Sequence, residues 1–156
     1  MKTITIEKKP EHNVIVGMSH FIKTIRDIPA ALKKAVPDVK FGMAFCEASG
    51  KRLIRKAGTS DELIDLAVKN AQAIGAGHSF IIILDGTFPI QVLNELKRVE
   101  EICTIYCATA NPLKVLIMEE DDQRGIIGVL DGQIPLGVET EKDVQEREKL
   151  LKKLGY

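Results

Sequence analysis

The chain has 156 residues, a length typical of one compact domain, and a hydrophobic content of 45% that is sufficient for a buried core. Its 22 basic and 22 acidic residues give a net charge of zero, which excludes the broad positive field of general nucleic-acid binders and membrane-surface proteins. The sequence has no apolar run of the signal-peptide type and no stretch long enough to span a membrane. We therefore expect one soluble, cytoplasmic domain over residues 1–156, without nucleic-acid or membrane partners.

Strand patterns are frequent in the first part of the chain, where apolar residues alternate with polar ones or form short apolar runs. The expected strands cover residues 2–8, 13–18, 39–48 and 52–57. The first two are close in sequence and favour a β-hairpin. The last two flank Ser49-Gly50-Lys51, whose glycine suits a tight reversal, and predict a second hairpin.

Two amphipathic helices are expected in the same half. Residues 24–36 repeat apolar side chains at helical spacing, and Pro37 closes this helix. The second helix begins after Ser60 with acidic residues in its first turn, and it ends at Gly75.

The pattern of the second half of the chain predicts a βαβ unit. It consists of an apolar strand over 80–84, an amphipathic helix over 89–99 and another apolar strand over 102–108. Strands over 113–119 and 125–130 then bracket an acidic turn, and a helix rich in Lys and Glu covers 141–154. We expect an α/β fold with a mixed β-sheet, packed helices and at least one βαβ unit.

The predicted βαβ unit places polar residues together at one sheet edge. Its two strands run parallel, so Asp85 and the segment from Thr109 to Asn111 are expected at the same edge. The helix that begins near Thr87 would add free N–H groups suited to a phosphate. Alternatively, Asp85 and Thr87 only form a turn and cap this helix.

A second polar cluster surrounds the turn from Glu47 to Arg52, which combines a carboxylate, a hydroxyl, a glycine and two cations. The cluster is not a P-loop, because the required upstream glycine is missing, and the chain has no GxGxxG fingerprint. A hairpin followed by a crossover would make the strand before Glu47 antiparallel to residues 80–84. Whether Glu47 shares the edge of Asp85 therefore stays open.

Other reactive residues have simpler explanations. Ser19-His20 and His78-Ser79 are poor nucleophile–base pairs, since neighbours on a strand point to opposite faces. The acidic run 119–122 is suited to Mg²⁺ or to a solvated turn.

The three cysteines, Cys46, Cys103 and Cys107, are expected to be reduced and packed as small hydrophobic side chains. No metal site is expected between the last two, because an extended strand would separate them by about 13 Å. The apolar neighbours of Cys46 also make it a poor nucleophile.

Five segments together carry a family resemblance: GMSHFIKT (17–24), FGMAFCEASGKRLIR (41–55), GAGHSFIIILDGTFPIQVLNELKRV (75–99), ICTIYCATANPLKVLI (102–117) and RGIIGVLDG (124–132). In this order they resemble the adenosine-specific kinase family, some members of which are labelled adenosine monophosphate-protein transferases. The resemblance implies a small α/β protein, of a kind common in thermophilic archaea and bacteria. It also implies that the protein binds adenosine, AMP, ADP or ATP and forms a homo-oligomer, with a trimer favoured.

The resemblance further implies phosphoryl transfer from ATP to adenosine. Asp85 is the first candidate and Glu47 the second to accept the ribose hydroxyl proton, while cations and the Mg²⁺ that accompanies ATP neutralise the phosphates. The candidate nucleotide-binding residues are Ser19, His20, Phe21, Lys23, Ser49, Gly50, Lys51, Arg52, His78, Ser79, Thr87, Thr109, Asn111, Arg124 and Gly125. No protein side chains are assigned as metal ligands.

Two alternatives stay open: a non-catalytic sensor of adenine nucleotides, and transfer of AMP to a partner protein. Phe21 and Phe88 are the aromatic candidates for stacking on adenine, and Ile or Leu side chains could equally enclose the base.

Overall fold

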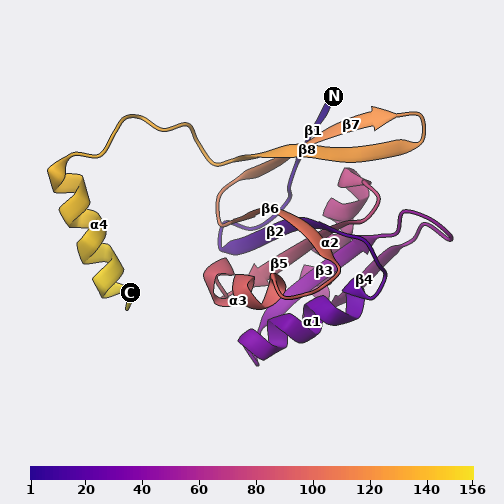
Figure 1. The fold of residues 1–156 in the computed structure, drawn as a ribbon, viewed down its shortest axis with the longest axis horizontal. Coiled ribbons are helices and arrows are strands. Elements are labelled where there is room, and N and C mark those ends of the chain that lie inside the picture. Colours follow the sequence, from indigo (N-terminus) through magenta and orange to yellow (C-terminus); the bar gives the residue numbers. More distant parts are fainter.

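The computed structural model describes all residues, Met1–Tyr156, as eight strands in two sheets and four helices (Figure 1). The strands are β1 (Lys2–Thr5), β2 (His12–Ser19), β3 (Lys40–Cys46), β4 (Ile54–Gly58), β5 (Ser79–Asp85), β6 (Ile102–Thr109), β7 (Leu113–Glu120) and β8 (Gln123–Asp131). The helices are α1 (Thr24–Ala35), α2 (Asp61–Ile74), α3 (Pro89–Leu96) and α4 (Glu141–Lys153). None of them combines the length and the apolar character needed to cross a bilayer.

The larger sheet has five strands in the order β4-β3-β5-β2-β6, and each neighbouring pair is antiparallel. Strands β5 and β6 both pair with β2, so they run parallel to each other with β2 between them. The α/β class and the βαβ unit are therefore confirmed. The sheet is antiparallel and not mixed, because β2 separates the two strands that the crossover makes parallel.

The predicted hairpin at the N-terminus is wrong. β1 pairs with β7 in a separate three-stranded sheet, ordered β1-β7-β8, while β2 lies in the five-stranded sheet. Between the two strands the chain changes layer, and Ile6 is buried there and donates its N–H to the Leu113 carbonyl at 2.9 Å. The other predicted hairpins, β3-β4 and β7-β8, are confirmed.

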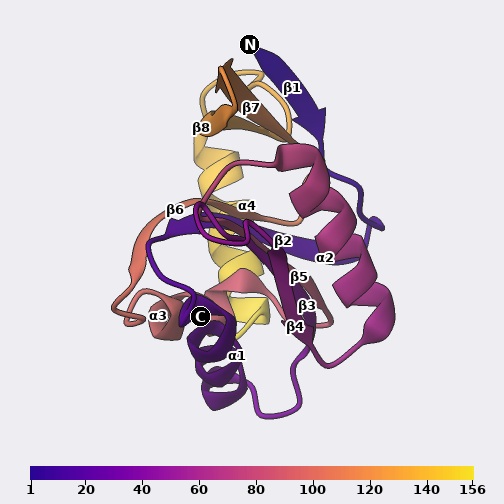
Figure 2. The same cartoon turned by 90° about the vertical axis from the view of Figure 1, so that its right-hand side faces the viewer.

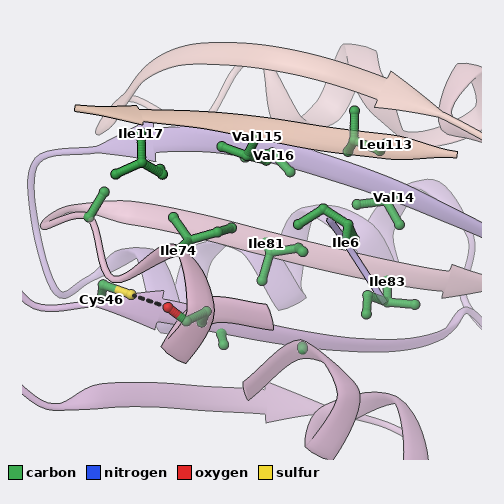
Figure 3. Close-up of a cluster of buried hydrophobic side chains, with 14 of the residues drawn as sticks. Ile6, Val14, Val16, Cys46, Ile74, Ile81, Ile83, Leu113, Val115 and Ile117 are labelled. Atoms are coloured by element: carbon green, nitrogen blue, oxygen red, sulfur yellow. Dashed lines mark hydrogen bonds between the residues drawn. The ribbon is translucent and has the colours of Figure 1, made fainter. Parts of the chain in front are cut away.

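The five-stranded sheet is covered on both faces, which explains its uniformly apolar central strand (Figure 2). Phe80, Ile82 and Leu84 pack with α1 and α3. Ile81 and Ile83 point to the opposite face, toward α2 and the three-stranded sheet (Figure 3). Alternation along β5 thus divides the buried side chains between two cores.

Two glycines fix the position of α2. A Cβ at Gly42 on β3 would lie 2.1 Å from the backbone carbon of Leu63. Only glycine at this position therefore permits the close approach of α2 to β3. At the other end, Gly75 ends α2 in the left-handed region, with φ of 59°. The predicted helix boundaries at Ser60 and Gly75 are confirmed.

Candidate functional site

A cleft of about 1000 Å³ opens where β2 and β3 end and β5 begins. Its walls come from three segments far apart in the sequence: the β3–β4 turn, the turn between α2 and β5, and the tip of the β7–β8 hairpin. A side pocket of about 230 Å³ adjoins the cleft, because both hollows share Glu47, Ala48 and His78. This end of the sheet is called the cleft end below.

Glu47 follows directly after β3 and is held on both carboxylate oxygens. Its Oε2 accepts the backbone N–H of Leu53 at 2.8 Å, and its Oε1 accepts from Arg55 Nη2 at 2.8 Å. The Leu53 N–H and then the Arg55 guanidinium lower the pKa of Glu47. The residue is therefore an oriented, ionised carboxylate at the boundary of the cleft and the side pocket.

His78 stands between the two hollows on a left-handed backbone, with φ of 65°. Its N–H donates to the Cys46 carbonyl at 2.7 Å, and its carbonyl accepts the N–H of Ser19 at 2.9 Å. The ring stacks on Phe45, with centroids 6.0 Å apart. These contacts fix the imidazole relative to the ends of β2 and β3.

Three cations face the cleft, and they differ in their existing partners. Lys51 makes no hydrogen bond or ion pair, while Arg52 lies 3.5 Å from Asp122. Arg124 is anchored: its Nε donates to Glu119 at 2.6 Å, and its Nη1 lies 3.2 Å from the Ala73 carbonyl at the end of α2. Lys51 is thus the cation most available to a ligand anion.

The remaining predicted residues at the cleft end divide into ligand-facing and structural ones. His20, Phe21 and Ser49 line the side pocket, and Gly125 lines the cleft. Gly50 forms the β3–β4 turn with φ of 66°. Phe21 is 52% exposed, and its ring stacks on that of His20, with centroids 6.2 Å apart.

The other three predicted polar residues at this end already have partners. The Ser19 hydroxyl bonds with Thr24 and donates to the Glu101 carbonyl at 2.9 Å, and the Ser79 hydroxyl donates to the Ala76 carbonyl at 2.7 Å. Both serines are buried. Lys23 pairs with Asp27 at 2.7 Å and with Glu100 at 2.9 Å. These residues hold the loops around the side pocket and do not line either hollow.

Asp85, Thr109 and Asn111 lie together at the opposite end of the five-stranded sheet, as the βαβ unit predicts. Asp85 pairs with Lys40 at 3.2 Å. Thr109 and Asn111 both donate to Asp131 Oδ1, at 2.7 and 3.1 Å. β3 is antiparallel to β5, and Phe45 pairs with Phe80, so Glu47 lies at the Ser79 end of β5. Asp85 is six residues further along β5, about 20 Å away, so Asp85 and Glu47 do not share an edge.

The turn before α3 differs from its expected form. Thr87 is buried and does not cap the helix; its carbonyl accepts from Asn13 Nδ2 at 3.0 Å. The N-cap is Phe88, whose N–H donates to Gln91 Oε1 at 2.8 Å. Because Phe88 lies at this end of the sheet, it does not line the cleft as an adenine platform.

The three cysteines are free, and their environments differ. Burial raises the pKa of Cys46 and raises that of Cys107 to about 11, so both are poor nucleophiles. Cys103 is exposed, contrary to the expectation that it is packed, because β6 is an edge strand of the sheet.

Several residues that line the cleft were missed by sequence reasoning. The apolar ones include Met18, Leu53, Ile54 and Met118, and the polar ones include Gln72, Glu120, Asp122 and Gln123. Glu120 and Asp122 belong to the acidic run 119–122, whose composition suggested a possible Mg²⁺ site but not its position beside the cleft. No cluster of three or more His, Cys, Asp or Glu side chains is arranged as a metal site.

Comparisons with known proteins agree with this architecture. A solved structure, the PH1918 protein from Pyrococcus horikoshii OT3, superposes with a TM-score of 0.95 at 42% sequence identity, covering 99% of this chain and 96% of that one. No curated protein matches the sequence significantly. The family model described as adenosine specific kinase matches residues 4–156. The chain therefore belongs to the adenosine-specific kinase family.

Proposed function

We propose that the protein binds adenosine and ATP in the cleft and transfers the terminal phosphoryl group of ATP to a ribose hydroxyl of adenosine. Membership of the family supports a nucleotide-related kinase role. The observation that carries the proposal is the combination, in one cleft, of the unpaired Lys51, two further cations and the ionised Glu47. A cytoplasmic location and a homo-oligomer, with a trimer favoured, belong to the same proposal.

The chemistry requires one proton acceptor and several positive charges. The ribose oxygen forms a bond to the γ-phosphorus, the bond from that phosphorus to the bridging oxygen breaks, and ADP leaves. Glu47 accepts the hydroxyl proton through a remaining lone pair, since each carboxylate oxygen can accept more than one hydrogen bond. Its low pKa makes it a weak base, but phosphoryl transfer depends mainly on positioning and electrostatic stabilisation. Lys51 and Arg52 bind the phosphates.

The carboxylates of the hairpin tip would hold the Mg²⁺ that accompanies ATP. Glu120 and Asp122 line the cleft, and Mg²⁺ in kinases is commonly held by one or two carboxylates together with the substrate phosphates. When bound, the ion neutralises charge on the phosphate oxygens. The side chains of the hairpin tip would hold it on the side of the cleft that faces Arg52.

The side pocket is suited to the adenine base. Phe21 offers an exposed ring face, while Ile22 and Phe45 supply apolar surface beside it. The shared boundary at Glu47 and His78 would then set the ribose between the base and the phosphates.

The proposal favours Glu47 over Asp85 as the proton acceptor. Glu47 borders both hollows, whereas Asp85 lies at the far end of β5, about 20 Å away along the strand. One observation supports the sensor alternative: both oxygens of Glu47 already accept hydrogen bonds within the protein. A carboxylate held in this way binds hydroxyl groups well even when no transfer follows.

Labelled ATP tests the proposal. With adenosine and γ-labelled ATP, a kinase produces labelled AMP; a sensor shows only a ligand-dependent rise in melting temperature. Label from α-labelled ATP on a protein would identify AMP transfer instead. We expect labelled AMP.

We also expect adenosine and AMP to raise the melting temperature of the protein more than guanosine does at equal concentration. The exocyclic groups of guanine differ from those of adenine and would leave buried polar groups of the site unpaired. Equal shifts for both nucleosides would contradict adenosine selectivity.

A further inference from the structure

The last part of the chain, residues 132–156, is a C-terminal arm that leaves the body at the end of β8 and projects away from it (Figure 1). Every residue of the arm is exposed except Val144, which is half-buried. Gly132 donates its N–H to the Pro112 carbonyl at 3.0 Å, and beyond it all hydrogen bonds and ion pairs of the arm are internal. The arm is therefore a structured segment without a core of its own.

The arm nevertheless carries two exposed apolar segments. In the part before α4, Ile134, Leu136 and Val138 are 84, 102 and 93% exposed. This part is not a strand and the chain bends at Gly137, so the three side chains form an exposed apolar stretch. In α4 and its C-terminal cap, Leu150, Leu151 and the cap residue Leu154 gather with Val144 on one helix face, and all three leucines are exposed. Seven of the sixteen exposed large apolar residues of the protein belong to this arm.

The helix itself indicates that these segments are covered in solution. α4 has 13 residues and a complete N-terminal cap, in which the Thr140 N–H donates to Asp143 at 2.7 Å. Helices of this length are marginal in water when isolated, and most of their stability in proteins comes from packing of the apolar face. An amphipathic helix without any buried residue in its own chain thus requires a surface elsewhere.

The charge of the arm argues for a protein surface. The arm has five acidic and five basic residues, so its formal charge is zero and offers no attraction to anionic lipid or nucleic acid. The body of the same chain has an exposed apolar area at the root of the arm. Ile127 and Leu130 on β8, the edge strand of the three-stranded sheet, are 55 and 50% exposed.

We propose that the C-terminal arm packs on a second copy of this chain, with its exposed apolar residues against Ile127 and Leu130 of β8. Each copy carries one arm and one such β8 surface, so the contact is heterologous and closes into a ring when the rotation between copies permits. This inference rests on the homo-oligomer of the proposed function and assigns the surface that joins the copies, but it does not depend on the activity of the cleft.

The test uses the full chain with substitutions on each side of the contact, measured by light scattering after size exclusion at micromolar concentration. We expect the wild type at a multiple of 17.2 kDa and the variant carrying Leu136→Asp and Val138→Asp shifted to 17.2 kDa. Leu130→Asp, or the milder Ile127→Gln, is expected to weaken the same assembly. Ile90→Asp is the matched control, because Ile90 is 61% exposed but lies on α3, and it should keep the mass of the wild type.

Circular dichroism and thermal melting show whether each variant is folded. A wild type of 17.2 kDa would overturn the proposal, and a monomer that also sediments with anionic vesicles would point to a membrane surface instead. An arm variant that is folded and keeps the wild-type mass would overturn it as well. Retention of the wild-type mass by both β8 variants would exclude β8 as the receiving surface.

Discussion

Glu47 and Arg55 form an ion pair across the β3–β4 hairpin, with Glu47 Oε1 and Arg55 Nη2 2.8 Å apart. The pair is shielded, since the Glu47 side chain is 13% exposed and that of Arg55 is 35% exposed. Together with the Leu53 N–H, the pair keeps the pKa of Glu47 low and fixes the carboxylate where the cleft meets the side pocket. A fixed acceptor at this boundary favours one orientation of a bound ribose hydroxyl.

Glu47→Gln is therefore expected to lower kcat for adenosine phosphorylation by about 10²-fold, because the amide keeps the shape but loses the proton acceptor. Adenosine affinity, measured by calorimetry, should change far less. Asp85→Asn tests the competing assignment and should leave turnover within a few-fold of the wild type. The opposite pattern, with turnover lost only in Asp85→Asn, would return the role to Asp85.

Sequence reasoning found the pieces of the cleft but not their assembly. The turn at 47–52 was identified from local residue types, whereas the His78 segment and Arg124 were candidates implied by the family resemblance. Their meeting point depends on the register that pairs Phe45 with Phe80, and on a β7–β8 hairpin held by its pairing with β1. Such long-range pairing leaves no local pattern in the sequence.

Burial explains the candidates that do not line the cleft. Ser19 and Ser79 have the residue type of ligand contacts, but their hydroxyls bond to the carbonyls of Glu101 and Ala76. These acceptors come from chain turns whose approach cannot be predicted from residue spacing. The edge at Asp85 was predicted correctly, yet the antiparallel direction of β3 places Glu47 at the other end.

Lys51→Gln should weaken ATP binding by about tenfold or more and leave adenosine binding unchanged. The reason is that Lys51 has no protein partner, so its full charge is available to the phosphates, where one charge-assisted hydrogen bond contributes about 1.5–3 kcal/mol. Calorimetric titration with ATP and with adenosine measures both affinities. Lys33→Gln on α1 is the control, since Lys33 is exposed and outside the cleft. Equal losses in the two variants would indicate a general charge effect.

Gly42→Ala should destabilise the fold strongly, because the new Cβ would lie 2.1–2.3 Å from backbone atoms of Leu63 and Ile64. Backbone atoms cannot rotate away, so α2 must shift from β3, and the loss should reach the upper end of the ~1–3 kcal/mol typical of overpacking. Urea unfolding measures it. Gly125→Ala is the matched control, because its Cβ would meet no atom within 4 Å. If Gly42→Ala unfolds at the same urea concentration as the control, the contact between β3 and α2 is looser than described.

Glu101 provides a prediction about pH, because it is a buried acid beside Ser19 and the side-pocket loop. Its side chain is 2% exposed, and neither carboxylate oxygen has a hydrogen-bond partner. Lys23 lies 4.0 Å away but already binds Asp27 at 2.7 Å, which lowers the pKa of Asp27. Burial, followed by the neighbouring Asp27, raises the pKa of Glu101.

The sign of the pH effect follows from this raised pKa. Between the ordinary pKa of a glutamate and the raised one, the folded protein holds a proton that the unfolded chain has released, so the contribution of Glu101 to stability falls as pH rises. Glu101→Gln cannot ionise and does not have this loss. The free energy of unfolding of Glu101→Gln, relative to the wild type, should therefore increase as the pH rises above the ordinary pKa of a glutamate, as measured in urea titrations. Glu100→Gln is the control, since Glu100 is 81% exposed and pairs with the same Lys23. If the difference in the free energy of unfolding between Glu101→Gln and the wild type does not change with pH, Glu101 does not hold a proton in the folded protein. The same conclusion follows if Glu100→Gln shows the same pH dependence.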